Sequence, residues 1–254
     1  MIDFHCHIIY GVDDGAKSLE ESLNMIDEAK RAGFTEIILT PHYISEYYET
    51  NAMGIKKILE ELQSYCQSKE IKLHQASEIY AYEDMASLLE QKKASNIGNT
   101  RYVLFELPRN NEILDISPMI YNLLEHKYIP VIAHPERYSY IQKNPNKVIS
   151  WIEDGALLQA NFASIIGIYG KDAKNTLIKM LKHDMIHFFG TDCHRQQSIY
   201  LKMPEILSEL KKVLSENEIY KLTTKNAEEI LNGNILEVPE PQIIKESFFG
   251  KIFK

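Results

Sequence analysis

The chain opens with Ile2-Asp3-Phe4-His5-Cys6-His7, a short apolar run that carries two histidines one residue apart. Side chains alternate between the two faces of a strand, so His5 and His7 should point to one face and Cys6 to the other. Two neutral imidazoles side by side at a strand end can hold one metal ion. A polar pair can also simply mark the place where a strand leaves the core, so the later strands must distinguish these two interpretations.

The length and composition fit a globular α/β protein. The 254 residues are enough for one α/β barrel or for two smaller domains, and a hydrophobic content of 44% allows a full core. The net charge of −8 argues against nucleic acid as a partner, because a phosphate backbone requires a basic surface. The three cysteines (Cys6, Cys66 and Cys193) are too few for a disulfide framework and indicate a reducing compartment. With no signal-peptide pattern and no apolar run of membrane-spanning length, we expect a cytoplasmic protein.

Short apolar segments alternate with helical patterns along the chain. Strands are expected at residues 2–7, 36–40, 72–77, 102–105, 130–133, 157–160 and 186–190. Helices are expected at residues 19–32, 55–66, 85–90, 116–125, 148–153, 173–181, 204–214, 216–222 and 226–231. This alternation is typical of parallel β-α units, in an open doubly wound sheet or in a closed barrel. We expect no domain boundary before a tail that begins at Val238.

Every expected strand leads into a side chain that can bind a metal ion or form a hydrogen bond. In chain order these are His5 with His7, His42, Glu78, Glu106, His134, Asn161, and Asp192 with His194. In α/β barrels the active site lies at this end of the strands and takes residues from several of them. Each side chain alone could be a solvated strand end or a turn residue, but the set indicates a metal site or a catalytic site.

The types of side chain in this set favour one class of metal site. Imidazoles and carboxylates without a thiolate favour manganese, iron or zinc in a hydrolytic multi-metal site over a structural cysteine-rich zinc site. Cys6 and Cys193 stand beside candidate ligands, but strand alternation turns both away from the metal face. We therefore expect both cysteines to be buried in the core.

Seven motifs in this order resemble a known superfamily. They are Asp3-Phe4-His5-Cys6-His7, Asp13-Asp14-Gly15, Thr40-Pro41-His42, Glu78, Glu106, His134-Pro135-Glu136-Arg137 and Gly190-Thr191-Asp192-Cys193-His194. The pattern is similar to the polymerase and histidinol phosphatase (PHP) superfamily. Within it, the pattern resembles the bacterial tyrosine-protein phosphatases of capsule and exopolysaccharide operons, the CpsB, CapC and YwqE group. The resemblance covers about residues 1–232 and implies a distorted seven-stranded (β/α)7 barrel of the PHP type. We expect a phosphatase domain at residues 1–237 and a C-terminal tail at 238–254.

The resemblance also implies three divalent metal ions, with manganese favoured over iron, zinc or magnesium. One ion would be bound by His5, His7, Glu78 and Asp192, a second by Glu78, Glu106 and His134, and a third by Asp14, His42 and His194. Three divalent ions and four carboxylates leave two positive charges, which a phosphate monoester dianion would neutralise. The ions would orient the phosphate and lower the pKa of a bridging water toward about 7, so that hydroxide can attack phosphorus in line.

Arginines are the expected substrate-binding residues. The resemblance implies that Arg137 holds the non-bridging phosphate oxygens through its forked donors, and that Asp192 and His42 take part in catalysis. Arg137 could instead form an ordinary ion pair with Glu136 or another neighbour. Arg195 is the arginine that follows the last motif, and its match to a second substrate arginine of the family is loose.

The loop after His42 and the end of the chain are candidate contact surfaces. We expect Tyr43, Tyr47 and Tyr48 on the substrate rim, where aromatic rings could pack against phosphotyrosine, although they could also pack on neighbouring loops. The substrate implied by the resemblance is a phosphotyrosine protein, a tyrosine kinase that regulates capsule synthesis. The lysine-containing apolar tail could dock on the barrel or fray, or it could make a weak contact with a membrane surface.

Other enzyme classes fit the sequence less well. A cysteine phosphatase needs Cys-x5-Arg, and the residues six positions beyond the three cysteines are Val12, Lys72 and Ile199. Residues 167–171 resemble a phosphate-binding P-loop but lack its first glycine. An amidohydrolase would require an eighth strand and usually a bridging lysine. A small-molecule phosphatase of the histidinol-phosphate type would use the same metal chemistry, and a non-catalytic phosphotyrosine-binding partner remains a further alternative.

Overall fold

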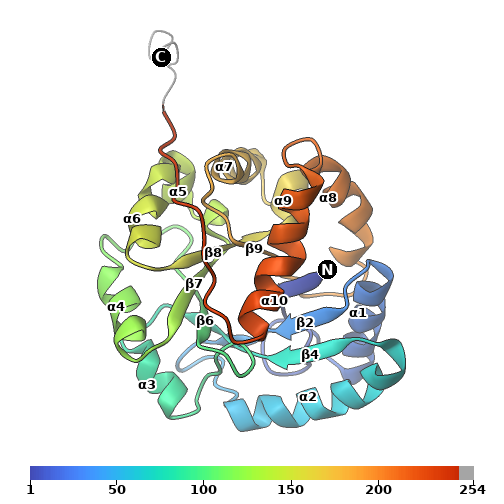
Figure 1. Cartoon of the computed structure of the whole chain (residues 1–254). Helices are drawn as coiled ribbons and strands as arrows, with labels where there is room; N and C mark the ends of the chain where they lie inside the picture. The colour runs from blue at the N-terminus through green and yellow to red at the C-terminus, as the bar shows by residue number, and fades with distance from the viewer. Residues whose placement is uncertain (246–254) are drawn as a thin grey trace.

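The structure of the chain is a computed structural model that describes residues 1–245 (Figure 1). Its strands are β1 (Ile2–Cys6), β2 (Glu36–Leu39), β3 (His42–Tyr43), β4 (Lys72–Gln75), β5 (Glu78–Tyr80), β6 (Tyr102–Glu106), β7 (Ile129–Ala133), β8 (Leu157–Asn161) and β9 (Phe188–Gly190). Its α-helices are α1 (Leu19–Arg31), α2 (Ala52–Cys66), α3 (Met85–Glu90), α4 (Ser117–Glu125), α5 (Ser139–Lys143), α6 (Val148–Glu153), α7 (Lys171–Leu181), α8 (Met203–Leu210), α9 (Glu216–Tyr220) and α10 (Asn226–Leu231). Strands and helices alternate, as expected for an α/β protein.

The strands form two sheets in which every neighbouring pair is parallel. One sheet has the order β1-β2-β4 and the other the order β3-β5-β6-β7-β8-β9. A short strand that was not expected follows each of the expected second and third strands: β3 follows β2 after Thr40 and Pro41, and β5 follows β4 after Ala76 and Ser77. The parallel α/β architecture is therefore confirmed. The strand hydrogen bonds define two sheets, and a closed seven-stranded barrel is not confirmed.

The outer strands of the two sheets approach each other at β1 and β9. An isolated parallel bridge joins Cys6 to Cys193, and the backbone N–H of His7 donates to the carbonyl of Cys193 at 3.0 Å. The same strands also pack through Phe4 and Phe188, whose rings stack with centroids 4.1 Å apart. Since β1 carries His5 and leads into His7, this contact fixes the position of the opening motif.

Apolar side chains cover both faces of the sheets. A large cluster of buried residues lies between the strands and the surrounding helices, and a smaller one gathers Phe4, Val131 and Phe188 with Ile230 of α10. In Figure 1, α10 lies near the middle of the view, over the strands. The burial of α10 against the smaller cluster closes the end of the sheets opposite the strand carboxyl ends.

Several elements differ from the sequence-based expectation. Helix α2 begins at Ala52, three residues before the expected start, because the Asn51 side chain accepts a hydrogen bond from the Gly54 N–H and caps it. Helix α5, directly behind the expected fifth strand, was not predicted. The expected helices at 216–222 and 226–231 are joined by a π-helical turn, Lys221–Lys225. The helices that the structure describes include none that is long and apolar enough to cross a membrane.

The described part of the tail lies against the protein. We call residues 234–245 the C-terminal strap. The Tyr102 hydroxyl donates to the Asn234 carbonyl, the Gln242 N–H donates to the carbonyl of His183, and the Ile244 N–H donates to Asn146. Figure 1 shows this strap running across β6, β7 and β8 toward α5. Residues 246–254, to which most of the membrane-contact hypothesis applies, lie outside the described residues.

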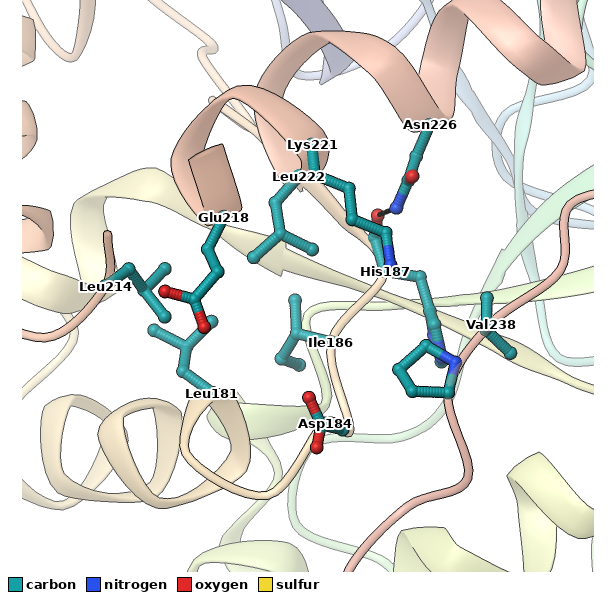
Figure 2. Close-up of a pocket in the computed structure, with 11 residues that line it drawn as sticks. Leu181, Asp184, Ile186, His187, Leu214, Glu218, Lys221, Leu222, Asn226 and Val238 are labelled. Atoms are coloured by element: carbon teal, nitrogen blue, oxygen red, sulfur yellow. Dashed lines mark hydrogen bonds between the residues drawn. The ribbon is translucent and has the colours of Figure 1, made fainter. Parts of the chain in front are cut away.

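A small cavity lies beneath the strap at the amino-terminal end of β9. It encloses about 70 Å3 and is lined by His187, Lys221, Val238 and other side chains drawn in Figure 2. The Nδ1 atom of His187 accepts a hydrogen bond from the Leu158 N–H at 2.9 Å, and its Nε2 atom has no partner among the described residues. Burial, together with the charge of Lys221, lowers the pKa of His187 to about 3, so this imidazole is neutral at pH 7.

Candidate metal centre

The nine predicted metal ligands come together at the carboxyl ends of the strands. They form four groups in which the possible ligand atoms lie within 4.8 Å of one another: His7, Asp14, His42 and His194; His5, Glu78 and His134; His5, His7 and Asp192; and His42, Glu78 and Glu106. Most of these side chains are buried, whereas Asp14 is about half exposed. Because the groups share members, they form one continuous cluster that could hold more than one cation.

Glu78, at the start of β5, lies at the centre of this cluster. Its Oε2 atom lies 3.2 Å from His5 Nε2, 3.3 Å from His7 Nε2 and 3.0 Å from His42 Nδ1. None of these contacts has hydrogen-bond geometry, and both Glu78 Oε2 and His42 Nδ1 are buried without a partner. Buried polar atoms without partners are costly, so this arrangement fits ligands that surround a cation.

Hydrogen bonds on the far side of the rings orient the two histidines of the opening motif. His5 Nδ1 lies 2.8 Å from Gln159 Oε1, and His7 Nδ1 lies 2.8 Å from Asp13 Oδ2. Since both partners are oxygen acceptors, each Nδ1 carries a proton, and a ring in its neutral form presents a bare Nε2. The two Nε2 atoms lie only 3.1 Å apart. Two facing lone pairs at this distance need a proton or a cation between them, and the donor set suits a divalent metal.

The carboxylates of the cluster differ in the direction of their pKa shifts. Burial opposes ionisation of Glu78, but the charges of His5 and His42 hold its pKa well below the usual range. The pKa of Asp192 is also held well below the usual range, by His5 and Arg137 among others, against the effect of burial. Glu106 behaves differently, because burial and the charge of Glu78 raise its pKa to about 7. The raised pKa of Glu106 reflects in part the negative charge of Glu78, which a bound cation would offset.

Special backbone conformations bring the ligands into place. His134 and Asp192 have left-handed φ values of 34° and 51°, which turn the chain sharply after β7 and β9.

Two glycines of the site stand where a side chain has no room. A Cβ atom on Gly15 would lie 2.2 Å from the carbonyl oxygen of His7, and one on Gly190 would lie 2.5 Å from the Cβ of His5.

Arg137 lies at the edge of the cluster and has two contacts. Its guanidinium donates to Asp192 Oδ2, and its central carbon lies 4.1 Å above the centroid of the Tyr169 ring. Asp192 Oδ2 also accepts from Asn161 Nδ2 at 2.8 Å, while Oδ1 of the same carboxylate lies 3.4 Å from His7 Nε2. The ion pair expected as an alternative for Arg137 is thus made with Asp192, and Glu136 instead accepts from the Asn161 N–H.

Arg195 and the tyrosines of the loop after His42, the other predicted substrate residues, occupy different surroundings. Arg195 is exposed, and its Nη1 donates to the backbone carbonyls of Asp14, Gly15 and His194 at 2.5–2.7 Å. The Tyr48 ring lies nearly parallel to His42 with centroids 6.1 Å apart, and Tyr47 is 74% exposed beside it.

The expectation for Tyr43 is wrong. This side chain is 4% exposed and belongs to the large core cluster. The segment that was expected to be a loop is strand β3, and neighbouring strand residues face opposite sides, so His42 faces the metal ligands while Tyr43 faces the helices. Tyr43 therefore does not line the rim of the site.

The expectation for the cysteines is confirmed. Cys6 and Cys193 are buried, and neither thiol belongs to a ligand group. Cys6 Sγ lies 3.5 Å from the carbonyl of Ile38, and Cys193 Sγ lies 3.2 Å from Ser198 Oγ. Burial raises the pKa of Cys6 well above the usual range and that of Cys193 to about 11.

Three residues of the site were missed in the sequence. Gln159 looked like an interior residue of its strand, and Tyr169 lay in the glycine-containing stretch that was considered only as a P-loop. Asp13 belongs to a quoted motif, but its position next to Asp14 gave no sign that it would bind a histidine ring instead of a metal. The signal available for Gln159 was a polar side chain within an otherwise apolar strand.

The fold and the site together define an α/β protein with parallel strands and a candidate multi-metal centre at their carboxyl ends. A sequence model of the family described as "Capsular polysaccharide synthesis, CpsB/CapC" matches residues 1–232, and the chain belongs to this family. It is 32% identical over 253 residues to the tyrosine-protein phosphatase YwqE of Bacillus subtilis, covering 98% of this chain and 99% of the relative. It is 28% identical over 247 residues to the tyrosine-protein phosphatase CpsB of Streptococcus agalactiae, covering 93% and 100%.

A solved structure is similar over the whole fold. It comes from a crystallographic study of YwqE from Bacillus subtilis and CpsB from Streptococcus pneumoniae, described as unique metal-dependent tyrosine phosphatases. The TM-score is 0.89 at 30% identity, covering 97% of this chain and 100% of that chain. A histidinol phosphate phosphatase from Lactococcus lactis shares the fold at 14% identity, with a TM-score of 0.57, covering 84% of this chain and 93% of that chain.

Proposed function

We propose that this protein is a metal-dependent protein-tyrosine phosphatase. The observation that carries the proposal is the convergence of nine imidazoles and carboxylates, among them Glu78, whose Oε2 faces three ring nitrogens without a hydrogen bond. The relatives named tyrosine-protein phosphatases, matched over almost their entire length, support phosphotyrosine as the substrate. The family's connection with capsular polysaccharide synthesis supports a bacterial tyrosine kinase of capsule or exopolysaccharide synthesis as the protein that is dephosphorylated.

We propose three divalent ions, with manganese favoured over iron, zinc or magnesium. The sites would be His5, His7, Glu78 and Asp192; Glu78, Glu106 and His134; and Asp14, His42 and His194. The observed groups that contain Asp192 and Asp14 support the first and third sites, and the 3.7 Å separation of His134 Nε2 from Glu106 Oε2 supports the second. When bound, the ions would supply Lewis acidity, which orients the phosphate and generates hydroxide near neutral pH. Oxygen and imidazole ligands suit manganese, and no thiolate competes for a softer metal.

The protein's own residues would bind and orient the phosphoryl group. Arg137 donates to Asp192 through one terminal nitrogen, and its other N–H groups have no protein acceptor among the described residues. A planar fork with free donors beside the ligands is suited to non-bridging phosphate oxygens. Tyr47 and Tyr48 would receive the aromatic ring of the substrate at the rim, and Arg195 would add positive charge.

We further propose that the two sheets form one distorted seven-stranded barrel of the PHP type. The bridge between Cys6 and Cys193 and the continuity of β2 with β3 and of β4 with β5 support closure. Residues 1–237 would be the phosphatase domain, followed by the tail at 238–254. The three free, buried thiols support a reducing compartment, and we propose the cytoplasm.

The experiment that tests the function combines elemental analysis with kinetics. Purified protein is loaded with manganese, and hydrolysis of phosphotyrosine peptides and of histidinol phosphate is compared before and after chelation. We expect metal-dependent hydrolysis that favours the peptides. The variant His5→Ala should lose both metal and activity, while His126→Ala, at an exposed histidine of the helix α4 end, should keep both. Preference for histidinol phosphate, or hydrolysis that survives complete metal removal, would contradict the proposal.

A further inference from the structure

The guanidinium of Arg137 is held on a flat aromatic surface. Its central carbon lies 4.1 Å from the centroid of Tyr169, and only 9% of the Arg137 side chain is exposed. A terminal nitrogen of the same group donates to Asp192. One face of the cation and one of its five N–H groups are thus occupied by protein, and the remaining donors keep a fixed plane.

Tyr169 is itself held by the chain around it. Gly167 and Gly170 flank it with φ values of 80° and 94°, conformations that favour glycine, and the Gly170 N–H donates to the Gly167 carbonyl at 3.0 Å. The stretch that resembles a P-loop in sequence is therefore a tight turn that presents an aromatic ring.

This turn is tied to the segment that carries Arg137. The Gly167 N–H donates to the Ser164 carbonyl at 3.0 Å, and the Ser164 hydroxyl donates to Glu136 Oε1 at 2.6 Å. Glu136 directly precedes Arg137 and is fully buried. The turn that carries Tyr169 and the segment that carries Arg137 are therefore linked through Ser164 and Glu136.

We infer, on the basis of the proposed phosphatase function, that Tyr169 is a positioning residue that holds Arg137 in the orientation needed to bind the substrate phosphate. A long side chain fixed in advance loses less conformational freedom when it binds. The aromatic face is the active feature, since the Tyr169 hydroxyl has no hydrogen bond to the described residues. Phenylalanine at position 169 should therefore still hold Arg137 in place, whereas an aliphatic side chain should not.

The test measures kinetics on an aryl phosphate and metal content for substitutions at Tyr169. We expect Tyr169→Leu to lower kcat/KM roughly tenfold, mainly through a higher KM, with full metal content, in line with a desolvated cation–π contact. Tyr169→Phe should remain within about twofold of the unmodified protein. Ile168→Ala, a change at the neighbouring residue, which is 44% exposed, is the matched control and should have no effect. If Tyr169→Leu does not fold, Tyr169→Met replaces it.

A double-mutant cycle separates positioning from a general structural role. If Tyr169 acts through Arg137, then adding Tyr169→Leu to Arg137→Ala should cause little further loss. Additive losses, loss of metal in Tyr169→Leu, or failure of Tyr169→Phe to restore KM would overturn the inference while leaving the proposed function intact. If the unmodified, metal-loaded protein does not hydrolyse phosphotyrosine, the proposed function fails, and the inference fails with it.

Discussion

Gln159 Oε1 accepts a hydrogen bond from His5 Nδ1 at 2.8 Å, so a neutral amide on β8 fixes the tautomer of a ring on β1. Asp13 does the same for His7 at the same distance. These two contacts decide which nitrogen of each ring faces the candidate metal centre. The orientation of the opening motif is therefore controlled by residues outside the predicted ligand set.

Removing either acceptor should weaken metal binding without removing a ligand. We expect Gln159→Leu and Asp13→Ala each to lower manganese affinity about 10- to 100-fold, because the rings lose the partner that orients them. The measurement is a competition titration with a chelator of known affinity. Gln91→Leu, at an exposed glutamine that follows α3, is the control. Unchanged affinity in Gln159→Leu would mean that packing alone orients the ring of His5.

The thiols should be dispensable for catalysis. Burial raises the pKa of Cys6 and brings that of Cys193 to about 11, so both are protonated at pH 7 and poorly nucleophilic. We expect Cys6→Ser and Cys193→Ser each to keep most of the hydrolysis of an aryl phosphate, while a chelator abolishes it in all variants. Loss of activity in a serine variant with normal metal content would point to a thiol mechanism.

Tyr47 and Tyr48 should act on binding more than on turnover. We expect Tyr47→Ala combined with Tyr48→Ala to raise KM for aryl phosphates more than it lowers kcat, since the substrate ring loses its packing surface. An alkyl phosphate lacks the ring, so its KM should change little. Tyr220→Ala, at a half-exposed tyrosine of α9, is the control. An unchanged KM for the aryl substrate would exclude this role.

His187 should make the protein sensitive to mild acid. Its pKa is about 3 in the folded state, against about 6.5 when unfolded, so below pH 6.5 the unfolded chain binds a proton that the folded chain does not. The free energy of unfolding should therefore fall between pH 6.5 and pH 3, by up to about 1.4 kcal/mol per pH unit from this group. His187→Gln keeps an acceptor for the Leu158 N–H but does not titrate, so it should reduce the slope.

Urea denaturation at several pH values measures this slope. His126→Gln, at a histidine whose side chain is 41% exposed, is the matched control and should leave the slope unchanged. Equal slopes in the unmodified protein and in His187→Gln would show that the folded state protonates this ring as easily as the unfolded state does.

The strand ends could be predicted because two local signals coincide there. An apolar run of four or five residues followed by His or Glu marks both the end of a strand and the chemistry of the site, and this holds at Glu106 and His134. Once the strands are known to be parallel, their carboxyl ends must meet, so the convergence of the ligands follows from the topology.

The remaining features depend on contacts that are distant in sequence. Tyr43 was misplaced because the two-residue strand β3 forms only by pairing with β5, which local composition does not reveal. Gln159 and Tyr169 became part of the site through partners more than thirty residues away, a separation over which sequence patterns carry no distance information. The sequence left open whether the tail docks on the barrel or frays, because the hydrogen bonds of the strap, such as that from Gln242 to His183, are equally remote.

Gly15 and Gly190 carry no functional group, but the packing of the site also restricts which residues can occupy these two positions. A methyl group at either position would overlap the backbone or the Cβ atom of a histidine ligand, at 2.2 Å and 2.5 Å. Neither neighbour can move aside without shifting His7 or His5. In a saturation mutagenesis library scored for growth or activity, both glycines should tolerate replacement as poorly as the histidines do. Changes in the sequence of this protein during evolution would then be limited as much by the space between its strands as by the chemistry of the site.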